Sequence, residues 1–85
     1  MAVVIQPTPN PNALKFVVGG HFPTPVSYVA GRPADHPAAD ALLALAGVTS
    51  VFMSADFVTI SKAAEAFWDE ITPAARRILE EHFAG

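Results

Sequence analysis

The chain has 85 residues, a length that accommodates one domain. Hydrophobic residues make up 52% and charged residues 15%, a composition typical of a globular domain and not of a disordered segment. The absence of cysteine excludes disulfides, thiolate zinc sites and cysteine-ligated iron–sulfur clusters, and a net charge of −3 with five scattered basic residues argues against nucleic-acid binding.

The start of the chain predicts neither a signal peptide nor a membrane anchor. The short apolar run at residues 1–5 has no basic residue before it and is interrupted at Pro7. No stretch approaches the roughly 18 apolar residues that a membrane span requires. We therefore expect a cytoplasmic protein.

The first part of the chain predicts strands separated by a stiff loop. Residues 3–5 form a β-branched run that suits a strand. Three prolines within residues 7–12 fix the backbone and cannot donate to a sheet, so this segment is expected to be a rigid loop. Apolar side chains alternate in residues 13–18, which predicts a strand with one face on the core. Residues 21–33 indicate an edge strand or an extended loop, because alternation over 26–30 follows two prolines.

A helix and a hairpin are expected next. The helix has Asp35 or His36 as its N-cap and ends at Gly47, where glycine adopts a left-handed cap easily. Residues 48–53 and 57–61 suit two strands, and the short connection between them predicts an antiparallel hairpin.

The closing helix has an apolar stripe at helical spacing that continues across Pro73. The helix either begins near Asp69 or restarts at Thr72. The stripe consists of Phe67, Ile71, Ala75, Ile78, Leu79 and Phe83. The whole order, ββαββα, predicts a single α+β domain over residues 1–85, with a mainly antiparallel sheet and two helices packed on one face.

No arrangement of residues predicts catalysis or a cofactor. The three histidines lack the spacing that places two imidazoles on one helical face. Asp35 and His36 would need a third ligand from elsewhere to hold a metal. Asp69 and Glu70 are adjacent on a helix and fit the dipole of its first turn. No serine lies in a nucleophile-elbow context. We expect a protein that is not an enzyme.

Three segments, in order, resemble the N-terminal domain of Nfu/NifU-type scaffold proteins. Residues 47–52 are similar to the family's GVxSVF strand and residues 56–62 to its DFxTxxK strand. Trp68 and Pro73 match its terminal element. The segment that is similar to the family's TPNPxxxKF run is Thr8-Pro9-Asn10-Pro11-Asn12-Ala13-Leu14-Lys15-Phe16. The resemblance covers essentially the whole chain.

The resemblance implies a role in iron–sulfur cluster assembly or delivery. In larger Nfu proteins a second domain holds the cluster through a CxxC motif, but this chain has no cysteine, so cluster ligation is not carried over. The role that remains is a non-catalytic interaction with an assembly factor, a CxxC-containing Nfu-type domain or a client apoprotein. Two departures from the family change a helix cap, at His36-Pro37, and the hairpin turn, at Met53-Ser54-Ala55.

The proline-rich loop is the candidate functional surface, because a rigid segment loses little conformational entropy on docking. The alternative is that its prolines and asparagines only fix a loop crossing. Trp68 is either an interface anchor or, as we favour, a side chain packed over the sheet. The expected partner-binding residues are Thr8, Pro9, Asn10, Pro11, Asn12, Lys15, Phe16 and Trp68.

Two other functions remain open. One is a structural or homo-oligomerisation module that pairs through an edge strand near Val26 to Ala30 and has no link to iron–sulfur chemistry. The other is a small metal-dependent enzyme that uses Asp35, His36 and an acidic residue.

Overall fold

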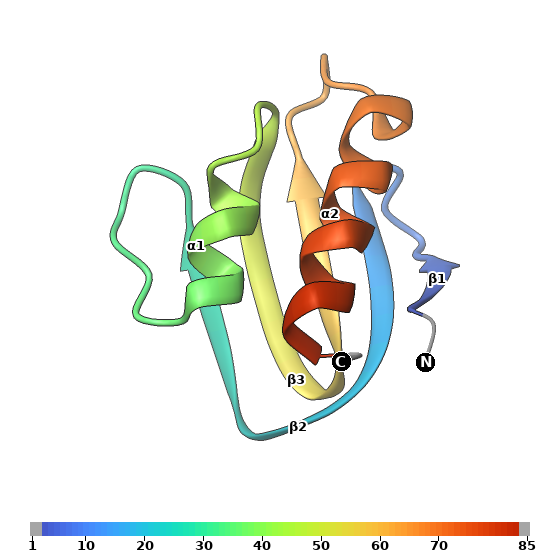
Figure 1. Cartoon of the computed structure of the whole chain (residues 1–85). Coiled ribbons are helices and arrows are strands. Elements are labelled where there is room, and N and C mark those ends of the chain that lie inside the picture. The colour runs from blue at the N-terminus through green and yellow to red at the C-terminus, as the bar shows by residue number, and fades with distance from the viewer. Residues whose placement is uncertain (1–2, 84–85) are drawn as a thin grey trace.

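A computed structural model describes residues 3–83, with side chains described at all of these positions except 20–23. One antiparallel sheet has the order β1-β2-β3, and both helices cover the same face of it (Figure 1). In chain order the elements are β1 (Val4–Pro7), β2 (Ala13–Val29), α1 (Pro37–Leu43), β3 (Val48–Lys62) and α2 (Trp68–Phe83). The predicted α+β class, with an antiparallel sheet and two helices on one face, is confirmed.

β2 and β3 both double back on themselves. At about 3.3 Å per residue, the 17 residues of β2 would extend over about 56 Å, yet the longest dimension of the molecule is 31 Å. Figure 1 shows each strand turning near its middle, with β2 passing around the outside of β3. The pairing agrees, because β2 advances by nine positions between Val17 and Val26 while β3 covers only four positions between Met53 and Phe57.

The inner turn lies at Ala55, which has a φ of 52°, and the outer bend includes Gly19, with a φ of 72°. Residues 48–53 and 57–61 therefore run in opposite directions (Figure 1), as the predicted hairpin requires. The arm of β2 at residues 26–29 pairs with β3 at the edge of the sheet, which confirms the edge strand.

The core lies between the sheet and the helices. From the sheet it takes the fully buried side chains of Phe16, Val51, Val58 and Ile60. From the helices it takes Ala38, Ala39, Leu42, Ala75 and Leu79. Each large side chain buried in this way contributes about 1.5–3 kcal/mol to stability, and the small alanines let the helices lie close to the sheet.

α1 begins as predicted but ends earlier. Nδ1 of His36 accepts a hydrogen bond from the backbone N–H of Ala38 at 3.2 Å, so His36 is the N-cap. The helix ends at Leu43, with Ala44 as its C-cap, and not at Gly47. A turn therefore separates the last helical residue from the glycine.

Gly47 allows the turn after α1 to lie close to the segment that enters α2. Its φ is 93°, a value that side chains with a Cβ rarely adopt. A Cβ added at this position would lie 2.7 Å from Cβ of Ala66 and 3.3 Å from Cδ1 of Ile71. Glycine is required here for space as well as for conformation.

α2 is one continuous helix that begins at Trp68, which agrees with the predicted start near Asp69 and not with a restart at Thr72. Pro73 is the sixth residue of this helix, and its missing N–H leaves the carbonyl of Asp69 without a helical donor. The buried stripe consists of Ile71, Ala75 and Leu79. Phe67, expected at the head of this stripe, precedes the helix and is 67% exposed.

Candidate functional site

The loop between β1 and β2, residues 8–12, is ordered by its own side chains, and we call it the proline loop. Oγ1 of Thr8 lies 2.9 Å from the carbonyl oxygens of Asn10 and Ala13 and accepts the N–H of Asn10 at 3.1 Å. Oδ1 of Asn10 accepts the N–H of Asn12 at 2.9 Å. These bonds and the fixed φ of the prolines make the loop stiff, as its sequence predicts.

Two side chains from distant parts of the chain fasten the proline loop. Nε1 of Trp68, at the start of α2, donates to the carbonyl oxygen of Pro11 at 3.0 Å. Nζ of Lys62, at the end of β3, donates to Oδ1 of Asn12 at 3.0 Å. The same Nζ lies 5.8 Å from the centroid of the Trp68 ring. The loop is therefore held in place by the sheet and the helix layer together.

The residues predicted to bind a partner do not form one surface. Pro9, Asn10 and Pro11 are exposed on the proline loop, and Trp68 lies against it. Lys15 lies on the opposite face of the sheet from the helices, with Nζ 4.4 Å from the centroid of the Phe57 ring.

Phe16 requires a correction. Its side chain has no exposed surface, so it belongs to the core and cannot contact a partner directly. The reason is strand alternation, which sends Phe16 toward the helices and its neighbour Lys15 away from them.

Trp68 is partly buried and packs against the core, which is the packing that the sequence favoured. In this position the indole N–H still donates its hydrogen bond to the proline loop. An anchoring role toward a partner stays a prediction.

A hollow of about 500 Å³ adjoins the loop's attachment to α2 and extends the candidate surface. It is lined by Trp68, Asp69, Thr72, Pro73 and Arg76. The sequence reasoning missed Lys62, Thr72 and Arg76 as parts of this site. A signal existed, since Trp68, Thr72 and Arg76 are four residues apart and share one helical face.

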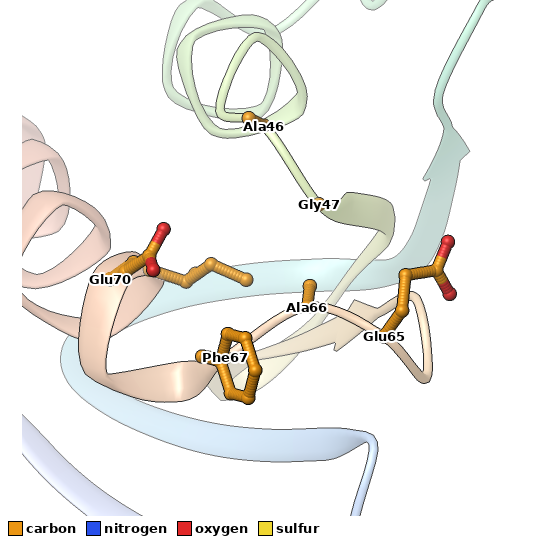
Figure 2. A pocket seen from close by; sticks show the side chains of 7 residues that line it. Ala46, Gly47, Glu65, Ala66, Phe67 and Glu70 are labelled. Atoms are coloured by element: carbon orange, nitrogen blue, oxygen red, sulfur yellow. The ribbon is translucent and has the colours of Figure 1, made fainter.

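A smaller hollow, of about 260 Å³, lies where the turn after α1 meets the start of α2. Figure 2 shows the carboxylates of Glu65 and Glu70 on opposite sides of the exposed Phe67 ring. The lining includes no cationic residue, but both carboxylates are exposed, and exposed charges attract a cation only weakly. The hollow does not by itself indicate a ligand.

The residues considered for metal binding have other contacts. Nδ1 of His36 caps α1, and Oδ1 of Asp35 accepts a hydrogen bond from the Tyr28 hydroxyl at 3.1 Å. Within residues 3–83, no three potential ligands gather around one point. No helix of the same range is long and apolar enough to cross a bilayer.

Comparisons with known proteins agree with this fold. A family described as "Scaffold protein Nfu/NifU N terminal" matches residues 3–85. The human protein named NFU1 iron-sulfur cluster scaffold homolog, mitochondrial, is 34% identical over 93 residues, which cover 99% of this chain and 35% of that protein. NifU-like protein C1709.19c of Schizosaccharomyces pombe is 33% identical over 84 residues, which cover 93% of this chain and 32% of that protein.

Among solved structures, the crystal structure of protein SAV1430 from Staphylococcus aureus matches with a TM-score of 0.84 at 25% identity. The match covers 94% of this chain and all of that one. Against the curated relatives, by contrast, the chain spans about a third of their length.

Proposed function

The chain belongs to the Nfu/NifU N-terminal family of scaffold proteins, and from this premise we propose that it is a non-catalytic protein-interaction module in iron–sulfur cluster assembly or delivery. The relatives named as iron–sulfur cluster scaffolds support the pathway. The lack of cysteine supports a role that does not ligate the cluster through thiolates. A cytoplasmic location is part of this proposal, although the human relative is named as mitochondrial.

The observation that carries the proposal is the double fastening of the proline loop by Lys62 and Trp68. A loop that is already ordered loses little conformational entropy when it binds a partner. More of the favourable contact energy therefore appears as affinity. Pro9 and Asn10 of the loop are exposed, and the Pro11 carbonyl is bonded to Trp68, which lines the hollow together with Arg76. We propose that a partner protein contacts this combined surface.

The partner belongs to one of three classes: a cluster-assembly factor, a CxxC-containing Nfu-type domain or a client apoprotein. The hollow offers apolar surface from Trp68 and Pro73 together with charges of both signs from Asp69 and Arg76. Such a mixture suits a polypeptide segment better than a small ion.

The test is an affinity capture from anaerobic lysate with the whole chain as bait. Pro9→Glu adds a charge to the exposed loop without removing any of the hydrogen bonds described above. Pro33→Glu is the matched control, since Pro33 is an exposed proline in the loop at the other edge of the sheet (Figure 1). Both variants are first checked for an unchanged melting temperature.

We expect the unaltered chain and Pro33→Glu to enrich iron–sulfur assembly proteins or clients, and Pro9→Glu to lose about tenfold of this enrichment, because a misplaced interfacial charge costs at least about 1.4 kcal/mol. Equal enrichment by both variants would place the binding surface elsewhere. A folded bait that enriches no such protein would reject the proposed function and leave the structural or oligomeric alternative.

A further inference from the structure

The face of the sheet opposite the helices carries an apolar stripe that crosses adjacent strands. Val4 of β1 pairs with Val17 of β2, which in turn pairs with Phe57 of β3. The Phe57 ring lies 6.3 Å from that of Phe52 on the other arm of β3. These four side chains form a row perpendicular to the strands, and we call it the open-face stripe.

The open-face stripe does not contribute to the core. Val4 is 51% exposed and Phe52 is 38% exposed, and none of the four side chains belongs to the buried cluster. Both described helices pack on the other face (Figure 1). Exposed apolar side chains that are scattered singly need no explanation, but a contiguous row of them is typical of a protein–protein contact.

Three residues of this face lie in segments that resemble the Nfu/NifU N-terminal family. Phe52 and Phe57 lie in the two segments that resemble the family's GVxSVF and DFxTxxK strands, and Lys15 lies in the TPNPxxxKF-like segment. All three meet on the open face, where Nζ of Lys15 is 4.4 Å from the Phe57 centroid.

The charge on this face is one-sided. Lys15 is the one ionisable side chain in its described rows, whose other polar members are Gln6, Ser27, Ser50, Thr59 and Ser61. The eight carboxylates of the chain lie on the helices, in loops or at the β3 turn. A second copy docked face to face would bring two Lys15 side chains together with no carboxylate between them, so charge complementarity favours a different protein that supplies an acid.

We propose that the open-face stripe binds an amphipathic helix of a partner protein, with a carboxylate of that helix opposite Lys15. The backbone groups under the stripe already pair within the sheet, so the contact is made by side chains and not by an added strand. The row spans three strand spacings, about 14 Å, which is the length of about ten helical residues. A helix laid there would add a third layer to the fold. This proposal does not depend on the proline loop.

The probes are two synthetic helical peptides with the same leucine stripe, one flanked by glutamates and the other by lysines. Each is titrated into the isotopically labelled chain and followed by NMR. We expect the glutamate peptide to shift the amides of Lys15, Val17, Phe52 and Phe57, and the lysine peptide to bind about tenfold more weakly. The net charge of −3 on its own would favour the lysine peptide, so the expected order isolates the effect of Lys15.

Variants locate the site. Phe52→Thr removes an exposed ring but suits a strand, and it should weaken binding of the glutamate peptide at least about tenfold. Phe67→Thr is the matched control, since Phe67 is an exposed phenylalanine at the helix side of the molecule, and it should bind normally. Lys15→Glu should reverse the preference between the peptides, and Pro9→Glu should change neither affinity.

Four results would overturn the proposal: no binding of either peptide, shifts that map to another surface, an equal loss in Phe67→Thr, or a Lys15→Glu variant that keeps the original preference. Self-association of the unaltered chain that Phe52→Thr abolishes, measured by light scattering, would identify a second copy as the occupant and would also reject it. Loss of partner capture in Pro9→Glu concerns the proline loop alone, so the two proposals can fail separately.

Discussion

The proline loop is held in place by hydrogen bonds from single side chains, whereas the strands are held by backbone hydrogen bonds. Prolines at positions 9 and 11 have no N–H to offer, so the loop cannot be stabilised by strand pairing. Trp68 instead donates to the carbonyl of Pro11, and Lys62 donates to the side chain of Asn12. Each such bond contributes about 1 kcal/mol, and a charged donor contributes somewhat more.

The pKa of Tyr28 depends on Asp35, which lies in the loop before α1. The Tyr28 hydroxyl donates to Asp35, and burial, then this hydrogen bond and the negative charge of Asp35, raise the pKa of Tyr28 above its ordinary value of 10.0. Because the folded-state pKa is the higher one, the associated stability is present below the unfolded-state pKa and is lost as the pH rises through the folded-state value.

We expect Asp35→Asn to lower the pKa of Tyr28, because the substitution removes the negative charge. Tyr28 is the sole tyrosine of the chain, so an ultraviolet absorbance titration of tyrosinate reads it directly. Asp40→Asn, a change on the exposed face of α1, is the control and should leave the titration unchanged. Identical curves for Asp35→Asn and the unaltered chain would contradict the contact.

At the scale of elements, the nested bends of β2 and β3 shape the sheet. The outer strand follows a longer path, and the register shifts between Val17, Phe22 and Val26 accommodate its extra residues. The inner strand turns at Ala55, whose positive φ places Cβ close to the backbone and costs roughly 1–2 kcal/mol relative to the right-handed region.

Ala55→Gly should therefore stabilise the domain by about 1 kcal/mol, because glycine adopts a positive φ without that strain. The control is Ala44→Gly at the C-cap of α1, where φ is −74° and glycine should instead lower stability by roughly 0.5–1 kcal/mol. Urea unfolding followed by circular dichroism measures both. A destabilised Ala55→Gly would mean that the turn does not require the left-handed conformation.

At the scale of the whole molecule, the two layers are joined by small residues. Ala38, Ala39 and Ala75 are fully buried between helix and sheet. Gly47 lets the turn after α1 approach Ala66 at the entry to α2. The close approach leaves no room for relaxation, since packing in a protein interior is dense.

Gly47→Ala is expected to lower the free energy of unfolding by about 2–3 kcal/mol, from backbone strain together with the overlap at Ala66. Gly31→Ala separates the two causes, because Gly31 has a similar φ of 86° but no atom within 4 Å of an added Cβ. That control should cost roughly 1 kcal/mol. Equal losses in the two variants, measured by urea unfolding, would show that the contact with Ala66 does not matter.

Local patterns in the sequence were sufficient to predict several parts of this protein. Alternation identified the strands, and prolines predicted the stiff loop because they restrict the backbone wherever they stand. His36 was recognised as one of two possible caps, and the motif-like segments indicated the family. Each of these depends on neighbouring residues, whose effects do not require knowledge of the fold.

The tertiary structure decided the rest. It showed that Phe16 is too deeply buried to contact a partner, although it was expected to do so, and it placed Phe67 in solvent, although Phe67 was expected in the apolar stripe of the closing helix. It also joined Trp68 to Pro11, a contact between residues 57 positions apart in the chain. Such contacts depend on how separate elements meet, and the energy that selects them appears only when the layers pack together, so no local pattern encodes them.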